Sequence, residues 1–283
     1  MTDITQLYGK TWFTWYDSAS GGIQGVIETC KATGASGVLV KAADGANKWA
    51  QLAQDGPAIK AAGLILGAWD YVYPTVSSEI QAQDAASALK IADYLVLDAE
   101  VEYEIATGAE AAMALGVAIR ALEPTALIGY TSFGAPQDHQ NFPYAAFSAW
   151  TDFCIPQIYW ADFGETPSSA LNNALSGLSH LHKRIFPAGQ AYAPATPLEI
   201  AEFSAACAER WIEGVFWWDI QSDTPALKQA VADSAVYIPK PPAPVRYQVV
   251  TGWFDGTKEG CPAAEEAAAK IKSLGWNSWV QKV

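Results

Sequence analysis

The chain alternates short apolar runs with amphipathic stretches eight times, and this rhythm constrains the fold more than any other feature. The apolar runs have the length of buried strands and cover residues 11–16, 37–42, 64–69, 94–100, 126–131, 153–160, 185–192 and 214–220. Stretches with helical periodicity follow them, at residues 22–34, 48–62, 77–90, 107–122, 143–150, 167–182, 197–211 and 224–233. Continuously apolar strands that alternate with helices predict a parallel sheet covered by helices.

Two closures of such a sheet compete, an open doubly wound sheet and a closed barrel. Eight strand–helix units within about 230 residues match the usual size of the barrel. No GxGxxG turn follows the first strand and no later turn carries a P-loop, so the nucleotide-binding form of the open sheet lacks its signature. We therefore predict an α/β fold, a (β/α)8 TIM barrel, over residues 1–236.

The composition excludes several classes of function. The formal net charge is −13, whereas binding to nucleic acid or to anionic lipid needs clustered Lys and Arg. No apolar run approaches the roughly 20 residues of a membrane-spanning helix. The cysteines lack the spacing of a zinc site, and we expect buried free thiols rather than disulfides at Cys30, Cys154, Cys207 and Cys261. We expect neither a metal nor a cofactor.

A proline-rich segment separates the predicted barrel from the last part of the chain. Residues 237–245 (YIPKPPAPV) contain four prolines and predict a semi-rigid linker. Residues 246–283 then have the pattern of a βαβ unit, with strands at 246–253 and 277–281 around a helix at 263–274. A unit this short buries little surface alone. We expect it to dock on the barrel or to pair with a copy of itself.

Two acidic residues end the fourth apolar run (YLVLDAE), and they are the first candidates for chemistry. Side chains alternate along a strand, so Asp98 and Glu100 share one face and Leu97 lies on the other. Active sites of TIM barrels lie at the C-terminal ends of the strands. Two carboxylates roughly 7 Å apart on one strand repel each other, and burial with repulsion raises the pKa of one of them. Glycoside cleavage needs that division into an acid and an ionised partner. In the alternative interpretation these acids only cap the strand or pair with Lys41.

The DxE sequence at this strand end resembles the signature of the family 25 glycoside hydrolases, the lysozyme-like muramidases. It resembles more loosely the DxE of chitinase-like barrels. Three further segments are similar to motifs of family 25 and come in the same order: residues 40–45 (VKAADG), 66–71 (LGAWDY) and 129–132 (GYTS). Trp218 and Asp219 are similar to the end of its eighth strand, and Asp17 stands near the position of its first-strand aspartate.

The resemblance implies a role for each matching acidic residue. Glu100 would be the general acid, and Asp98 would orient the acetamido group of the substrate or stabilise the charge that this group develops. Asp17 and Asp219 would complete a catalytic acidic rim. Sugar rings present apolar faces that pack on flat aromatic side chains, and residue 157 alternates inward with residue 159. We therefore expect the substrate-binding residues to be Lys41, Trp69, Tyr130, Gln157, Tyr159 and Trp218.

The C-terminal unit resembles half of a SPOR domain, a module that recognises peptidoglycan glycan strands. Residues 247–254 are similar to its opening strand and residues 263–276 to its helix and turn. The complete module has two βαβ halves, so the resemblance implies that a single half pairs with a second copy to form a homodimer. A docking tail without affinity for glycan is the alternative.

The leading hypothesis is an endolysin-type, muramidase-like glycoside hydrolase that cleaves the glycan strands of peptidoglycan or a related amino-sugar polymer. The alternative is a noncatalytic barrel that binds cell-wall glycan in a structural or secretion assembly. The first residues lack the basic and apolar regions of a secretory signal. We therefore expect the protein to reach the cell wall after release from the cell or by a non-classical route.

Overall fold

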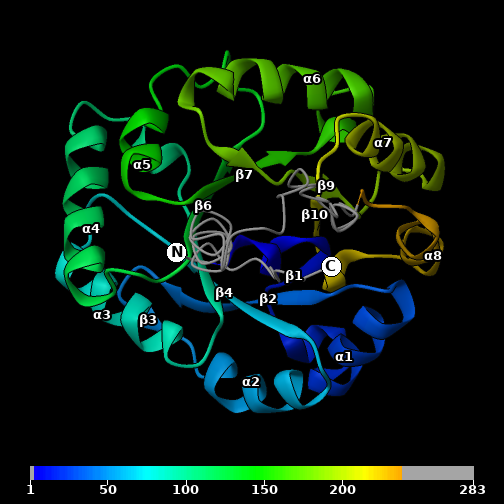
Figure 1. Ribbon diagram of the computed structural model, residues 1–283, viewed down its shortest axis with the longest axis horizontal. Helices are drawn as coiled ribbons and strands as arrows, with labels where there is room; N and C mark the ends of the chain where they lie inside the picture. The colour runs from blue at the N-terminus through cyan, green and yellow to red at the C-terminus, as the bar shows by residue number, and fades with distance from the viewer. Residues whose placement is uncertain (1–2, 238–283) are drawn as a thin grey trace, which may run out of the picture. The chain divides into compact units, whose positions relative to one another are not determined.

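The computed structural model describes residues 3–237 of the chain. Eight parallel strands form a closed barrel, because the first strand pairs with both the second and the last. Their order around the barrel is β1 (Gly9–Thr14), β2 (Gly37–Asp44), β4 (Ile65–Tyr71), β5 (Tyr94–Asp98), β6 (Ile128–Phe133), β7 (Phe153–Ile158), β9 (Ala188–Gln190) and β10 (Gly214–Trp218). The predicted (β/α)8 barrel is confirmed (Figure 1).

Helices surround the barrel, one after each of these strands (Figure 1). They are α1 (Gly22–Thr33), α2 (Gln51–Ala61), α3 (Ser78–Leu89), α4 (Gly108–Leu122), α5 (Tyr144–Trp150), α6 (Pro167–Leu178), α7 (Pro197–Glu209) and α8 (Pro225–Asp233). The last three begin at a threonine N-cap followed by proline in the first turn, a pair that satisfies a free N–H and presets the helical φ. At α7, Thr196 and Glu199 form a capping box.

Alternation along the strands divides the buried apolar side chains into two sets. Tyr94 and Val96 of β5 lie inside the barrel, whereas Leu95 and Leu97 lie between the barrel and the helices. All four are at most 1% exposed. Asp98 follows Val96 in the same alternation and therefore points inward, as the sequence predicts.

Two details differ from the sequence-based expectation. The seventh predicted strand is divided into β8 (Arg184–Ile185) and β9, with a proline between them that has no N–H for the ladder. A short strand, β3 (Asn47–Lys48), lies where the start of a helix was predicted. It pairs antiparallel with the end of β2 across a turn at Gly45, whose φ of 57° suits glycine.

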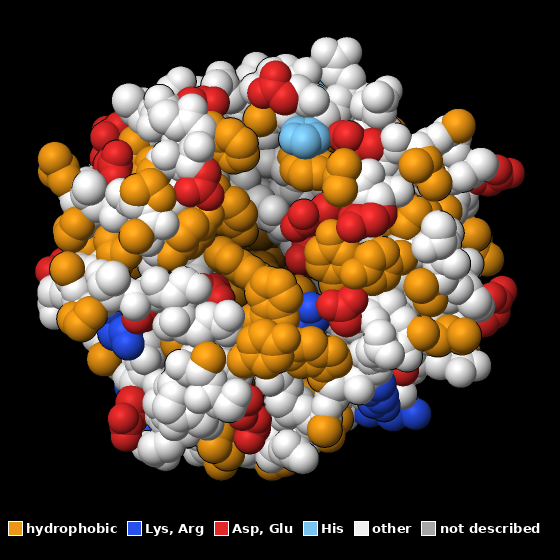
Figure 2. All heavy atoms as spheres, turned by 180° about the vertical axis from the view of Figure 1, so that it is seen from behind, with side chains coloured by type: hydrophobic (Ala, Val, Ile, Leu, Met, Phe, Trp, Pro, Cys, Tyr) orange, Lys and Arg blue, Asp and Glu red, His pale blue; other side chains and the backbone are white. Residues whose placement is uncertain are grey.

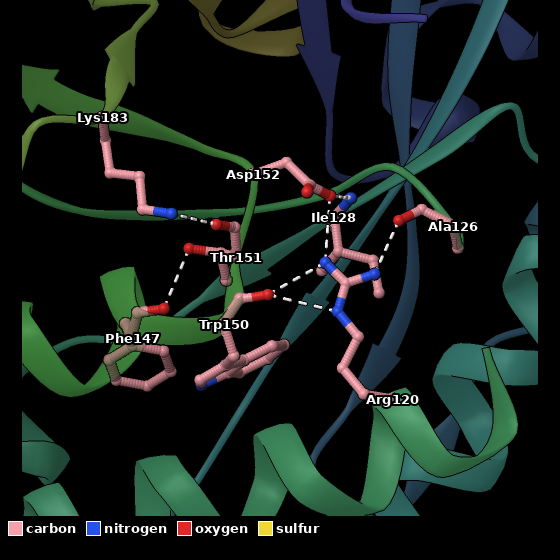
Figure 3. A network of polar contacts seen from close by, with 8 residues as sticks. All are labelled: Arg120, Ala126, Ile128, Phe147, Trp150, Thr151, Asp152 and Lys183. Atoms are coloured by element: carbon pink, nitrogen blue, oxygen red, sulfur yellow. Dashed lines mark hydrogen bonds and ion pairs between the residues drawn. The ribbon is translucent and has the colours of Figure 1, made fainter. Parts of the chain in front are cut away.

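A polar network ties α4 to the N-terminal ends of two barrel strands (Figure 3). The guanidinium of Arg120 donates hydrogen bonds to the carbonyl oxygens of Ala126 and Trp150 and to Oδ2 of Asp152. The same carboxylate oxygen accepts the backbone N–H of Ile128 at 2.9 Å. These contacts fix the start of β6 against the start of β7, at the end of the barrel opposite to the strand ends that carry the candidate site.

Three further expectations concern the cysteines, membrane-spanning helices and the C-terminal part of the chain. Cys30, Cys154 and Cys207 are buried and unpaired. Within residues 3–237, no helix has the length and apolar character needed to cross a membrane. Cys261, the linker beyond residue 237 and the βαβ unit at 246–283 lie outside the described residues.

Candidate active site

A cavity of about 780 Å³ opens among the C-terminal ends of the barrel strands. Its walls come from the ends of β4, β5, β7 and β10 and from the connections that follow β1, β6 and β7. Figure 2 shows a hollow in this part of the molecule, with hydrophobic side chains gathered around it and acidic side chains close by. The acidic residues that line it are Asp98, Glu100, Asp138 and Glu165.

Asp98 and Glu100 form the centre of the site. Asp98 is the last residue of β5 and is 4% exposed, whereas Glu100 is only partly buried. Gln157 of β7 reaches both carboxylates, and its Nε2 donates to Oδ1 of Asp98 at 3.0 Å and to Oε1 of Glu100 at 3.1 Å. One amide therefore holds two carboxyl groups together at the cavity.

Burial raises the pKa of Asp98 well above its ordinary value, and the negative charge of Glu100 raises it further. The ammonium of Lys41 and the amide of Gln157 act in the opposite direction, by a smaller amount. The carboxyl pair consequently keeps a proton at a pH at which an isolated carboxyl would have lost it. Such a pair can supply a proton to a bound substrate.

Three tryptophans form an aromatic floor, which we define as Trp15, Trp69 and Trp218. Each contacts the other two, with ring centroids 5.6–6.0 Å apart. The indole N–H of Trp69 donates to the carbonyl oxygen of Thr14 at 3.0 Å, which fixes that ring. All three line the cavity. Rigid aromatic surfaces of this kind can receive the apolar face of a sugar ring.

Two tyrosines add hydroxyl groups beside the carboxyl pair. Tyr71 and Tyr159 both line the cavity, and the hydroxyl of Tyr71 donates to Oε2 of Glu102 at 2.9 Å. Burial and nearby carboxylates, Glu100 and Asp98 among them, raise the pKa of both phenols above the ordinary value. Both hydroxyls therefore stay protonated and can act as hydrogen-bond donors.

Lys41, which the sequence suggested as a substrate-binding residue, does not line the cavity. Its side chain is fully buried, and Nζ lies 2.7 Å from Oδ2 of Asp44. The ammonium also lies 4.5–4.8 Å from the ring centroids of Trp15, Trp49 and Trp69. Cation–π attraction and the ion pair hold it beneath the aromatic floor. The structure therefore places Lys41 outside the lining of the cavity in which we expected it to contact substrate.

Tyr130 also lies away from the cavity, because it occupies the outward face of β6. Its ring stacks on Phe147 of α5 with centroids 5.4 Å apart, and its hydroxyl lies 3.0 Å from Oγ of Ser148. The side chain is fully buried there. The structure therefore places Tyr130, which we expected to bind substrate, in the core between strand and helix and not in the cavity lining.

Asp17 and Asp219 follow strand ends on the predicted rim, but neither lines the cavity. Asp219 is 1% exposed, and its Oδ1 accepts the backbone N–H of Ser222 at 3.2 Å. Asp17 accepts the N–H of Ser18 and lies beside Asp55, whose pKa rises to about 6 through burial and the contact with Asp17. Each aspartate thus accepts a local backbone N–H, and neither belongs to the lining that holds the carboxyl pair.

A histidine at the cavity wall, His139, was not predicted from the sequence. Nδ1 of His139 lies 2.8 Å from Oε1 of Glu104, and the imidazole ring lies on Phe133 with centroids 3.5 Å apart. His139 and Phe133 both line the cavity. The position of His139 in the sequence could have indicated this role, because it follows the strand β6, and the connection from β6 to α5 must lie at the catalytic end of a barrel.

Among residues 3–237, no group of three or more His, Cys, Asp or Glu side chains is arranged to hold a metal ion. The residues at the cavity therefore offer proton transfer, hydrogen bonding and aromatic packing. The other predicted substrate-binding residues, Trp69, Gln157, Tyr159 and Trp218, all line the cavity with Asp98 and Glu100.

No protein-family model and no curated protein sequence matches the chain. Among solved structures it is similar to the catalytic domain of a hyperthermophilic chitinase from Pyrococcus furiosus, with a TM-score of 0.61 and 10% identity over 79% of this chain and 93% of that one. A glycoside hydrolase family 18 N-acetylglucosaminidase from Paenibacillus barengoltzii gives a TM-score of 0.56 and 9% identity over 80% and 99% of the two chains. A Toxoplasma gondii protein assigned as a deoxyribose-phosphate aldolase gives 0.53 and 15% over 80% and 93%. At these identities the likeness shows a shared barrel fold.

Proposed function

We propose that the protein is a glycoside hydrolase that cleaves an amino-sugar polymer, with the glycan strands of bacterial peptidoglycan as its substrate. The observation that carries this proposal is the Asp98–Glu100 pair, held by the single amide of Gln157 at an aromatic cavity. Glu100 acts as the general acid, and Asp98 is the assisting carboxylate. The unit at residues 246–283 binds the same glycan or joins two copies of the chain.

The geometry supports a division of labour between the two carboxyl groups. Glu100 is the more exposed member and so the one nearer to a bound linkage. It donates the shared proton to the oxygen of the leaving sugar, and the negative charge left on the pair stabilises positive charge that develops at the anomeric carbon. Asp98, the more buried member, orients the acetamido group that lies beside that carbon.

The lining of the cavity supports a neutral polymer as substrate. The aromatic floor offers surfaces for sugar rings, and Tyr159 and Gln157 offer hydrogen bonds to hydroxyl or amide groups. Among the described residues that line the cavity there is no Lys or Arg. A phosphorylated sugar would meet acidic groups without a cation to bind it. This disfavours an aldolase that acts on a sugar phosphate, although one such protein has a similar fold.

The choice of an amino sugar has two supports. The chitinase and the N-acetylglucosaminidase named above share the barrel, and both names refer to N-acetylated sugars. The muramidase-like motifs at the strand ends support peptidoglycan in particular. The test is to incubate the protein with purified peptidoglycan and with chitin and to measure new reducing ends. New ends from neither polymer would contradict the proposal.

One observation favours a noncatalytic, glycan-binding barrel as the second candidate. Asp17 and Asp219, which would complete an acidic rim, do not line the cavity, so the carboxyl pair has no acidic partner from either position. Sedimentation with insoluble peptidoglycan separates the two functions. A barrel that only binds would sediment with the polymer and release no reducing ends.

A further inference from the structure

His139 and Glu104 form a second polar unit at the wall of the same cavity. Glu104 belongs to the connection after β5 and His139 to the connection after β6, so the barrel brings them together although 35 residues separate them in sequence. The side chain of Glu104 is 20% exposed, and that of His139 is 29% exposed. Neither residue takes part in the acid chemistry proposed above.

The orientation of the imidazole is fixed on two sides. Nδ1 lies 2.8 Å from Oε1 of Glu104, and the ring lies parallel to Phe133, with an interplanar angle of 3° and centroids 3.5 Å apart. Of the two neutral tautomers, a carboxylate at Nδ1 selects the one that carries its hydrogen on that atom. Nε2 then carries a lone pair that can accept a hydrogen bond.

Nε2 is the free polar atom of this ring. Within residues 3–237 it makes no hydrogen bond. It is also absent from the fully buried polar atoms without a partner, so it remains accessible. His139 also lines the cavity that holds Asp98 and Glu100. A ring held on one face by Phe133 and on one edge by Glu104 presents a fixed acceptor to whatever fills that cavity.

We propose that His139 is a substrate-binding residue whose Nε2 accepts a hydrogen bond from a hydroxyl or amide N–H of a bound sugar, with Glu104 and Phe133 as its positioning residues. This inference rests on the proposed glycan substrate. Four other residues of the lining, Asp98, Glu100, Asp138 and Glu165, are carboxylic acids, whose carboxylates also accept hydrogen bonds but carry charge. A neutral acceptor suits a neutral hydroxyl or amide without adding to the negative charge of the site.

The chain allows a matched test, because asparagine and glutamine each reproduce one nitrogen of the imidazole. His139→Asn keeps a donor near Nδ1 for Glu104 and removes the group at Nε2. His139→Gln extends an amide to the position of Nε2 and can still accept a hydrogen bond there. If His139 only supports the structure, the Asn variant should bind glycan as the parent does, because it keeps the contact with Glu104. If Nε2 binds the sugar, the Gln variant should bind as the parent does and the Asn variant should bind more weakly.

The measurement is calorimetric binding of a hexasaccharide of N-acetylglucosamine and of a glycan tetrasaccharide from peptidoglycan, in full-length chains that also carry Glu100→Gln. We expect His139→Asn to weaken binding of at least one glycan by roughly five- to tenfold, the size of one hydrogen bond. His139→Gln should stay within about twofold of the parent, and the thermal midpoints of both variants should stay near that of the parent.

The outcomes separate this inference from the proposed function. If the parent binds neither glycan, the proposed amino-sugar substrate fails, and the role of His139 fails with it. If the parent binds and His139→Asn binds equally well, only the role of His139 is overturned. In the catalytically active chain, His139→Asn should raise KM and leave kcat within about twofold. The lost hydrogen bond is made equally with the substrate and with the transition state, and the general acid Glu100 is unchanged.

Discussion

Asp98 and Glu100 share one hydrogen-bond donor, the amide of Gln157, at 3.0 and 3.1 Å. The carboxyl pair at the end of β5 therefore shares one amide donor as well as the proton that it retains. The ionisation of one group therefore depends on the other and on this amide.

Replacing Gln157 should move the pH dependence of activity. The amide stabilises the ionised form of Asp98, so Gln157→Leu raises the proton affinity of the pair, and both limbs of the profile of kcat/KM against pH should move to higher pH. Asn173→Leu is the matched control, because it removes another cavity-lining amide, one that donates to Glu165. Unchanged limbs in Gln157→Leu would contradict the coupling.

Lys41 should influence the same profile without touching substrate. Its charge lowers the pKa of Asp98, so Lys41→Met should move the alkaline limb to higher pH. KM should change little, because Lys41 does not line the cavity. The exposed Lys48 of β3 provides the control substitution, Lys48→Met. A large rise in KM in Lys41→Met, with no change in the profile of kcat/KM against pH, would show that Lys41 contacts the substrate directly and would contradict its placement outside the cavity lining.

Asp70 should make the barrel less stable as the pH rises. Burial, followed by the charge of Asp84, raises the pKa of this outward-facing aspartate of β4 to about 7. The unfolded chain has the ordinary value, so the folded state binds the proton more tightly, and stability falls between about pH 4 and pH 7. Asp70→Asn should reduce this decline, measured as the difference in unfolding free energy by urea at pH 4.5 and pH 7.5. An unaltered difference would refute the assignment.

The C-terminal unit should determine the oligomeric state. If residues 246–283 fold as the SPOR-like half that their sequence predicts, they leave a place for a second copy. The full chain should then be a dimer at tens of micromolar, and a chain that ends at Ala235 should be a monomer. Light scattering of both chains checks this expectation. A monomeric full chain would favour the docking-tail interpretation.

The barrel was predictable because its strands are continuously apolar and its helices are amphipathic. Alternation along β5 was enough to orient Asp98 correctly, since Val96 and Tyr94 fill the interior in the same period. The break between β8 and β9 and the hairpin of β3 were not predicted. They depend on single residues, a proline and a glycine, which do not alter the apolar pattern around them.

The residues at the site were harder to predict, because each depends on neighbours from other strands. At Gly129 an added Cβ would lie 2.2 Å from the ring of Phe153, so the glycine faces the crowded interior and Tyr130 must face outward. Lys41 lies against three tryptophans, none of which belongs to its own strand. His139 needed Glu104, from a different connection, to become recognisable as part of the site.

The role of Glu100 is tested most directly by the release of reducing ends from purified peptidoglycan by the Glu100→Gln chain, with Glu165→Gln as a control at the same cavity. We expect Glu100→Gln to lose activity by at least about a hundredfold while it still binds the polymer. Asp98→Asn should lose a comparable amount, and Glu165→Gln should keep most of the activity. Release of reducing ends by Glu100→Gln at the rate of the unaltered chain would contradict the assignment of Glu100 as the general acid.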